Sequence, residues 1–208
     1  MKILIISLGR SGSTYVYNSC IHYTNPELVD HQGRADKIWD ECIMEDTPVD
    51  ELNLLTKDLE HKENWTVKLH KCKINSITQD YFYKIAEMAD IVVEVVRKDV
   101  KATAISYSIA RMTGKWEMNN VGNSYSIPKE IFIDNLRFIN ENLKVIFDYP
   151  FDKCLSYEEL KNPREIYSSI TDIPVESLEP VIDYLQKNLV TVINQEQVDI
   201  WYDEFLER

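Results

Sequence analysis

The sequence predicts a three-layer α/β fold in which a central parallel sheet is flanked by helices. Two observations support this prediction. The apolar runs at residues 2–7 (KILIIS) and 91–96 (IVVEVV) are continuous rather than alternating, as is typical of strands buried on both faces. Segments with helical periodicity follow these runs along the chain. Strands that alternate with helices indicate a parallel sheet, because each crossover passes through a helix.

In chain order, the first half is expected to contain a strand at 2–7, a helix at 14–23, two weakly periodic helices near 35–45 and 49–61, a strand at 65–71 (WTVKLHK), an amphipathic helix at 79–89 and a strand at 91–96. The two helices near 35–45 and 49–61 are expected to lie outside the sheet.

In the second half, Asp99 is suited to cap a helix that runs to Thr113, and Gly114 suits the left-handed position that closes it. The polar segment 114–126 is predicted to be a loop or lid, since it has little periodicity. The sequence then predicts a helix from Pro128 to Phe147, a strand running into a helix at 153–160, and a mostly helical remainder after Pro174.

The length and composition indicate which class of protein this chain belongs to. The 208 residues are expected to form a single domain, residues 1–208, with 44% hydrophobic and 28% charged residues, as is typical of a soluble globular protein. No stretch reaches the roughly 18 consecutive apolar residues that a membrane helix needs. The first apolar run ends at Ile6, too early for a signal peptide, so a cytoplasmic protein is expected.

The net charge of the chain and the spacing of its cysteines limit which binding partners and metal sites are expected. The net charge of −12 disfavours nucleic-acid binding, which needs a broad basic surface, so any anion must be held by a few local residues. The four cysteines form no CxxC pair and are expected to be reduced thiols: Cys20, Cys42, Cys72 and Cys154. No ligand cluster has the spacing of a metal site, so no metal is expected.

The segment SLGRSGSTYVYN, residues 7–18, follows the first strand and predicts an anion site. A strand, a glycine-containing turn and a helix start direct backbone N–H groups toward one point. Arg10 adds a charge, and further donors come from the hydroxyls of Ser11, Ser13 and Thr14. Parallel sheets bind ligands at the carboxyl ends of their strands, which is where this loop lies.

The loop differs from the GxxxxGK[ST] loop of nucleotide triphosphatases. Aligning Gly12 with the second glycine of that motif puts Ser7 at the first glycine and Ser13 at the lysine. The strand at 91–96 also lacks the terminal aspartate that magnesium binding requires. A magnesium-dependent kinase or nucleotidase with a degenerate loop is therefore an alternative that the sequence disfavours.

GRSGSTY, residues 9–15, resembles the 5′-phosphosulfate loop of sulfotransferases that use 3′-phosphoadenosine 5′-phosphosulfate (PAPS), in which lysine or arginine precedes Ser-Gly-Ser/Thr-Thr. The resemblance implies a P-loop-containing nucleotide-hydrolase-like fold and metal-independent transfer of a sulfonate group from PAPS to an acceptor hydroxyl, leaving adenosine 3′,5′-bisphosphate. The implied cofactor-binding residues of the loop are Arg10, Ser11, Gly12, Ser13 and Thr14. Tyr15 occupies the position of a stacking tryptophan in many family members.

A second segment resembles the site that holds the 3′-phosphate in this family. The similarity is closest to the bacterial trehalose-type, carbohydrate-directed branch, whose three short motifs correspond here to RKD at 97–99, AIS at 104–106 and TGKW at 113–116. The implied ligands are Ser106 and a basic residue. The common spacing selects Lys98, but Arg97 is favoured because a guanidinium binds phosphate bidentately.

TVKLHK, residues 66–71, resembles the Lys-x-His strand of cytosolic sulfotransferases. The resemblance implies that Lys68 contacts the transferring group and that His70 deprotonates the acceptor. Strand alternation puts both side chains on one face, with His70 nearer the carboxyl end, and an imidazole suits proton abstraction near neutral pH. Rival base candidates follow a fainter similarity to the trehalose-type branch at NPE, residues 25–27: Glu27, Asp30 and His31.

LSYEELKNP, residues 155–163, resembles a Tyr-Glu-Asp-Leu…Pro segment of the superfamily, which implies that Tyr157 contacts the adenine. The Arg-Lys-Gly element of cytosolic members has no counterpart. The resemblance covers residues 1–24, 65–116 and 150–163, a little under half the chain. Analogy favours a carbohydrate or glycolipid hydroxyl as the acceptor. A non-catalytic nucleotide-binding module is the remaining alternative.

Overall fold

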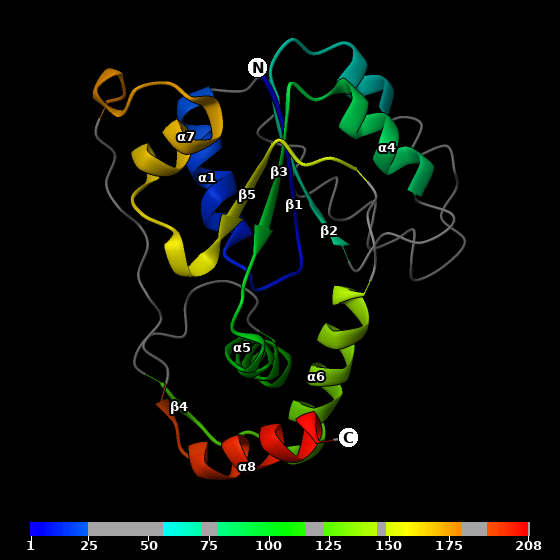
Figure 1. Ribbon diagram of the computed structural model, residues 1–208, viewed down its shortest axis with the longest axis vertical. Coiled ribbons are helices and arrows are strands. Elements are labelled where there is room, and N and C mark those ends of the chain that lie inside the picture. Colours follow the sequence, from blue (N-terminus) through cyan, green and yellow to red (C-terminus); the bar gives the residue numbers. More distant parts are fainter. Residues whose placement is uncertain (25–55, 72–78, 115–122, 145–148, 180–190, 208) are drawn as a thin grey trace. The chain divides into compact units, whose positions relative to one another are not determined.

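A computed structural model describes residues 1–24, 56–71, 79–114, 123–144, 149–179 and 191–207 (Figure 1). The chain divides into two compact units. The first comprises Met1–Val96 and Val145–Asp183, and the second comprises Arg97–Lys144 and Tyr184–Arg208. None of the described helices is long and apolar enough to cross a bilayer.

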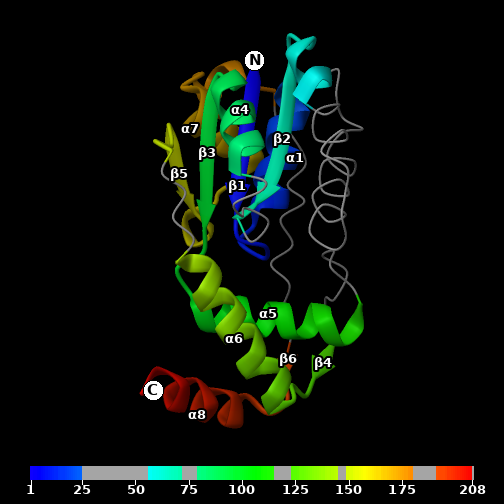
Figure 2. The same cartoon turned by 90° about the vertical axis from the view of Figure 1, so that its right-hand side faces the viewer.

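The first unit is built on a sheet of four parallel strands in the order β2-β1-β3-β5, which Figure 2 shows side by side. The strands are β1 (Lys2–Ser7), β2 (Trp65–His70), β3 (Ile91–Val96) and β5 (Lys153–Ser156). β1 is central and is buried from Ile3 to Ser7, as the continuous apolar run predicted. The predicted α/β class with a central parallel sheet is confirmed.

Helices cover both faces of this sheet (Figure 1). On one face α1 (Ser13–Thr24) packs against β2 and against α7 (Pro163–Thr171). On the other face α4 (Gln79–Met88) buries Phe82 and Ile85 in a core cluster with Leu4 and Val67. Full burial of one such side chain contributes about 1.5–3 kcal/mol, so this amphipathic face accounts for the position of α4.

The register of β1 and β2 decides which side chains face α1. Ile5 pairs with Lys68 and Ser7 with His70, and aligned residues of parallel neighbours share a face. Because Leu4 and Val67 belong to the α4-side core, these two pairs lie on the α1 side. The lysine and histidine of β2 therefore face the helix that begins just after the predicted anion loop.

The remaining described parts of the first unit are short. Residues 56–60 are helical, in agreement with the end of the predicted 49–61 helix, whereas 35–45 lies outside the described residues. β5 runs into a single 3-10 turn, η2 (Tyr157–Glu159), so the helix predicted there is only one turn long. Asn162 then caps α7 by accepting a hydrogen bond from the N–H of Glu165 at 3.1 Å. A second 3-10 turn, η3, spans Val175–Ser177.

The second unit is mainly helical. α5 (Val100–Thr113) packs on α6 (Lys129–Leu143), which packs on α8 (Gln195–Leu206). Asn135 of α6 donates to Ser108 Oγ of α5 at 3.0 Å inside this core. β4 (Ser124–Tyr125) pairs in parallel with β6 (Thr191–Val192). The predicted 114–126 loop thus contributes a short strand, and its residues 115–122 lie outside the described residues.

The described α6 is shorter than the predicted helix. It ends at Leu143 and Lys144 caps it, whereas the sequence pattern predicted a helix to about Phe147; residues 145–147 lie outside the described residues. Hydrophobic periodicity does not fix the last turn of a helix, because its carbonyl groups have no intrahelical N–H donors whatever the side chains are. After Pro174 the described helical segments are η3 and α8, and residues 180–190 lie outside the described part.

Asp99 and Gly114 begin and end α5 as predicted. The Asp99 carboxylate accepts a hydrogen bond from the N–H of Ala102 at 2.8 Å, and Gly114 has φ 66. Asp99→Ala should lower the free energy of unfolding by about 1 kcal/mol, whereas Asp99→Asn, which keeps the acceptor, should lose less. Urea denaturation measures both variants. Equal losses would contradict the capping role.

The two described cysteines should differ in reactivity. Both are free thiols; Cys20 is buried and Cys154 is exposed. Burial raises the pKa of Cys20 far above its ordinary value, so its reactive thiolate is scarce. In the folded protein a maleimide should label Cys154 and leave Cys20 unmodified until denaturant is added. Peptide mass spectrometry measures this, and rapid native labelling of Cys20 would contradict its burial.

Candidate functional site

The loop between β1 and α1 has two residues with positive φ, which the anion-binding arrangement called a nest requires. Arg10 has φ 62 and Gly12 has φ 84, on either side of Ser11. Alternation between left- and right-handed residues turns successive N–H groups toward a common point. The Gly12 carbonyl accepts hydrogen bonds from the N–H groups of Tyr15 at 3.0 Å and Val16 at 3.2 Å, which starts α1 directly after the loop. The positive end of a 12-residue helix therefore adjoins the nest.

Buried hydroxyl groups accompany the loop. Ser7, Ser11 and Ser13 are 0%, 1% and 3% exposed. Among the described residues, the Oγ atoms of Ser7 and Ser11 have no hydrogen-bond partner. Leaving such a group unsatisfied costs about 1–3 kcal/mol. An anion that accepts a hydrogen bond from Ser11 would recover part of this cost, so the orphaned hydroxyl is independent support for a ligand at the loop.

Lys68 supplies a buried cation next to the loop. The residue is 5% exposed, and its Nζ donates to Thr14 Oγ1 at 3.3 Å. Thr14 itself is exposed in the first turn of α1, where the N–H groups have no intrahelical acceptor. Two residues predicted for the site on separate grounds are thus in contact, although 54 positions separate them in sequence.

His70 ends β2 beside Ser7, the last residue of β1. The histidine is half-buried, whereas Lys68, two residues earlier on the same face, is buried. This arrangement places an imidazole at the carboxyl edge of the sheet, where the predicted base was expected. The structure therefore brings the loop, Lys68 and His70 to one edge of the first unit.

Tyr157, which directly follows β5, packs against the loop between β1 and α1. A Cβ atom added to Gly12 would lie 2.5 Å from Cδ2 of Tyr157 and 2.9 Å from Cδ1 of Leu160. Sequence reasoning selected Tyr157 as an adenine contact and missed Leu160. The three-residue spacing of Tyr157 and Leu160 could have indicated that Leu160 shares this contact, because side chains at i and i+3 of a 3-10 turn point the same way.

Tyr15, the other predicted adenine contact, is largely interior. It is 5% exposed, and its carbonyl accepts a hydrogen bond from Ser19 Oγ at 2.9 Å inside α1. A ligand would reach only a small part of its ring. The adenine contact of Tyr15 stays a prediction.

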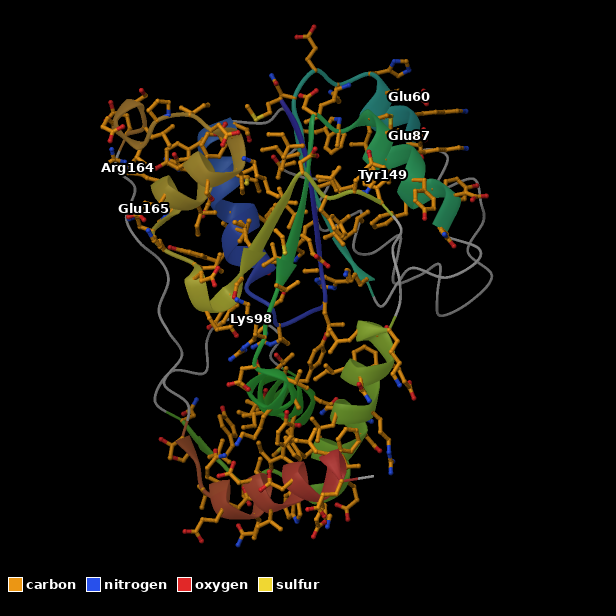
Figure 3. All side chains as sticks on the ribbon, in the orientation of Figure 1. Glu60, Glu87, Lys98, Tyr149, Arg164 and Glu165 are labelled. Atoms are coloured by element: carbon orange, nitrogen blue, oxygen red, sulfur yellow. The ribbon has the colours of Figure 1, made fainter. Side chains whose placement is uncertain are left out.

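The residues predicted to hold the 3′-phosphate belong to the second unit. Arg97 follows β3 directly and is half-buried, and the neighbouring Lys98 is exposed (Figure 3). Ser106 is half-buried in the middle of α5. The choice between the guanidinium and the ammonium stays a prediction. The three rival base candidates lie outside the described residues: Glu27, Asp30 and His31.

The acidic residue of β3 is engaged by other side chains. Glu94 forms an ion pair with Lys71 and accepts a hydrogen bond from Cys154 Sγ at 3.6 Å. It pairs in register with Ile6, so it faces the α4 side of the sheet, away from Lys68. Within the described ranges, no group of three or more His, Cys, Asp or Glu residues could hold a metal ion.

The fold and the site define an α/β protein with a parallel sheet and a nest-forming loop between its first strand and first helix. The chain matches no protein-family model and no curated protein sequence.

Proposed function

We propose that this protein is a sulfotransferase that moves a sulfonate group from PAPS to an acceptor hydroxyl. The observation that carries the proposal is the loop between β1 and α1, where left-handed Arg10 and Gly12 enclose the orphaned hydroxyl of Ser11. This geometry supports a P-loop-like phosphate cradle. The loop lacks the lysine of the triphosphatase motif, and Lys68 of β2, whose ammonium donates to Thr14 Oγ1, would supply a positive charge beside it.

PAPS supplies an activated sulfonate, whose S–O bond to the 5′-phosphate breaks as the acceptor oxygen bonds to sulfur. The side chains of this protein would position the groups and stabilise charge. Arg10, the nest N–H groups and the hydroxyls of Ser13 and Thr14 would stabilise the negative charge that grows on the leaving phosphate. Lys68 would hold the sulfonate oxygens.

His70 is proposed as the general base. It would accept the proton of the acceptor hydroxyl as the oxygen attacks sulfur. Its half-buried position beside Ser7 leaves the imidazole at the carboxyl edge of the sheet, where a ligand crevice is expected. The acceptor favoured by the resemblance is a carbohydrate or glycolipid hydroxyl, in the cytoplasm.

The second anion site follows from the sequence. PAPS carries a 3′-phosphate that ATP lacks, and the proposal assigns it to Arg97 or Lys98 together with Ser106. Arg97 is favoured because it directly continues β3 and can bind two phosphate oxygens at once.

The alternatives are weaker. A kinase or nucleotidase with a degenerate loop would need a carboxylate for Mg²⁺ near the end of β3. Glu94, the acidic residue of that strand, forms an ion pair with Lys71 and accepts a hydrogen bond from Cys154 Sγ. A non-catalytic nucleotide-binding module would share the anion loop and is separated from an enzyme only by a transfer assay.

The proposal is tested with PAPS labelled in its sulfonate group and a panel of sugar, glycolipid and phenol acceptors. We expect label transfer, and His70→Ala should reduce its rate by roughly 10²–10⁴-fold. His61→Ala, which removes an exposed histidine of the same unit, should leave the rate unchanged. Undiminished transfer in His70→Ala would move the base to Glu27, Asp30 or His31. Transfer to none of the acceptors would favour the non-catalytic module.

A further inference from the structure

We infer that Tyr157 is a positioning residue: with Leu160 it holds the loop between β1 and α1 in its anion-binding conformation, rather than serving as a platform for adenine. The inference rests on the proposed function only for the identity of the anion. It concerns the shape of the loop, which any phosphate- or sulfate-bearing ligand would need.

The packing of the two side chains on Gly12 is the first observation. The position of a Gly12 Cβ lies 2.5 Å from Cδ2 and 3.1 Å from Cε2 of Tyr157, so one edge of the ring is seated on the glycine backbone. Leu160 Cδ1 lies 2.9 Å from the same point. No side chain other than hydrogen fits at Gly12 while this contact is kept.

The loop needs such support because its conformation is unfavourable for the residues that form it. Arg10 has φ 62, a region that residues with a Cβ adopt only when their surroundings hold them there. The hydroxyl of Ser11, buried and without a partner among the described residues, adds to the cost of the ligand-free loop. Contacts from outside the loop must offset these costs, and the ring of Tyr157 supplies one directly.

The turn that carries Tyr157 is itself fixed. Ser156 pairs with Val96 in the sheet, and its Oγ donates to the Glu158 carboxylate at 2.6 Å. The N–H of Leu160 donates to the carbonyl of Tyr157 at 3.3 Å, which closes the 3-10 turn. Because side chains at i and i+3 eclipse in such a turn, both are directed at Gly12 together. The sheet thus fixes the turn that carries Tyr157 and Leu160.

The first test measures, in the ligand-free protein, hydrogen exchange of the Tyr15 and Val16 backbone amides, which donate to the carbonyl of Gly12 in the loop. Tyr157→Ala should accelerate their exchange at least several-fold, whereas Tyr157→Phe, which keeps the ring edge, should match the wild type. The control is Tyr149→Ala, which removes a tyrosine beside α4 whose hydroxyl donates to the carbonyl of Ala86 at 3.2 Å (Figure 3). It should leave loop exchange unchanged. Unchanged exchange in Tyr157→Ala would overturn the inference.

The second test compares two anions by calorimetry: inorganic pyrophosphate, which has no adenine, and adenosine 3′,5′-bisphosphate. A misplaced loop weakens both, so Tyr157→Ala should lose on the order of tenfold in affinity for each, which corresponds to about 1.4 kcal/mol. Tyr157→Phe should retain both affinities. Loss of affinity for the bisphosphate alone would identify an adenine contact and overturn the inference.

The two tests separate failure of this inference from failure of the proposed function. If the wild-type protein binds neither anion, the proposed function fails, and the exchange measurement still decides whether Tyr157 holds the loop. If both anions bind and Tyr157→Ala changes neither exchange nor affinity, the loop functions without this support.

Discussion

Gly12→Ala is expected to lower the free energy of unfolding by about 2–4 kcal/mol, the combined cost of a left-handed alanine and of overpacking. Gly12 has φ 84, and the added Cβ would meet Tyr157 Cδ2 at 2.5 Å. Relief requires the ring or the loop to move, so anion binding should be lost as well. Urea denaturation and calorimetry with adenosine 3′,5′-bisphosphate measure the two effects.

Gly114→Ala is the matched control. This glycine also has a positive φ, 66, but apart from its chain neighbours no atom of the described residues lies within 4 Å of the Cβ position. The variant should therefore lose only the backbone term, about 1–2 kcal/mol, and should keep its anion affinity. Equal destabilisation by the two substitutions would show that the Tyr157 contact at Gly12 does not restrict the loop.

Arg10→Gly is expected to separate stability from binding. Glycine adopts φ 62 without strain, which offsets its greater chain entropy in the unfolded state, so the free energy of unfolding should change by less than about 1 kcal/mol. Hydrogen bonds to a charged group contribute about 1.5–3 kcal/mol, so affinity for adenosine 3′,5′-bisphosphate should fall roughly 10- to 150-fold.

Arg10→Ala is the comparison for that variant. It removes the same charge but keeps a Cβ in the left-handed region, so it should bind as weakly as Arg10→Gly and be less stable. Wild-type affinity in Arg10→Gly would show that the guanidinium does not contact the ligand. Unfolding of Arg10→Gly would show that the side chain is structural.

Local sequence patterns predicted the sheet and the helix ends that have their own chemistry. Continuous apolar runs at 2–7 and 91–96 became β1 and β3, because a strand covered on both faces has no polar side to alternate with. α5 begins after Asp99 and ends before Gly114, as predicted, because capping depends on the residue at the cap itself.

Long-range packing was not predictable from those patterns. Alternation put Lys68 on a face with His70, but nothing local indicated that its ammonium would be buried against Thr14. The contact of Tyr157 and Leu160 with Gly12 joins distant parts of the chain, and only the assembled sheet brings β5 near the loop that follows β1. The inferred role of Tyr157 in supporting the loop therefore depends on a contact that only the folded chain shows.

We propose that the loop after β1 binds the phosphate end of PAPS without Mg²⁺. The most direct test of this proposal is calorimetry of the purified protein with adenosine 3′,5′-bisphosphate and, separately, with ATP and Mg²⁺. We predict tight, magnesium-independent binding of the bisphosphate that is weakened by Arg10→Gly. A preference for ATP with Mg²⁺ would contradict the account.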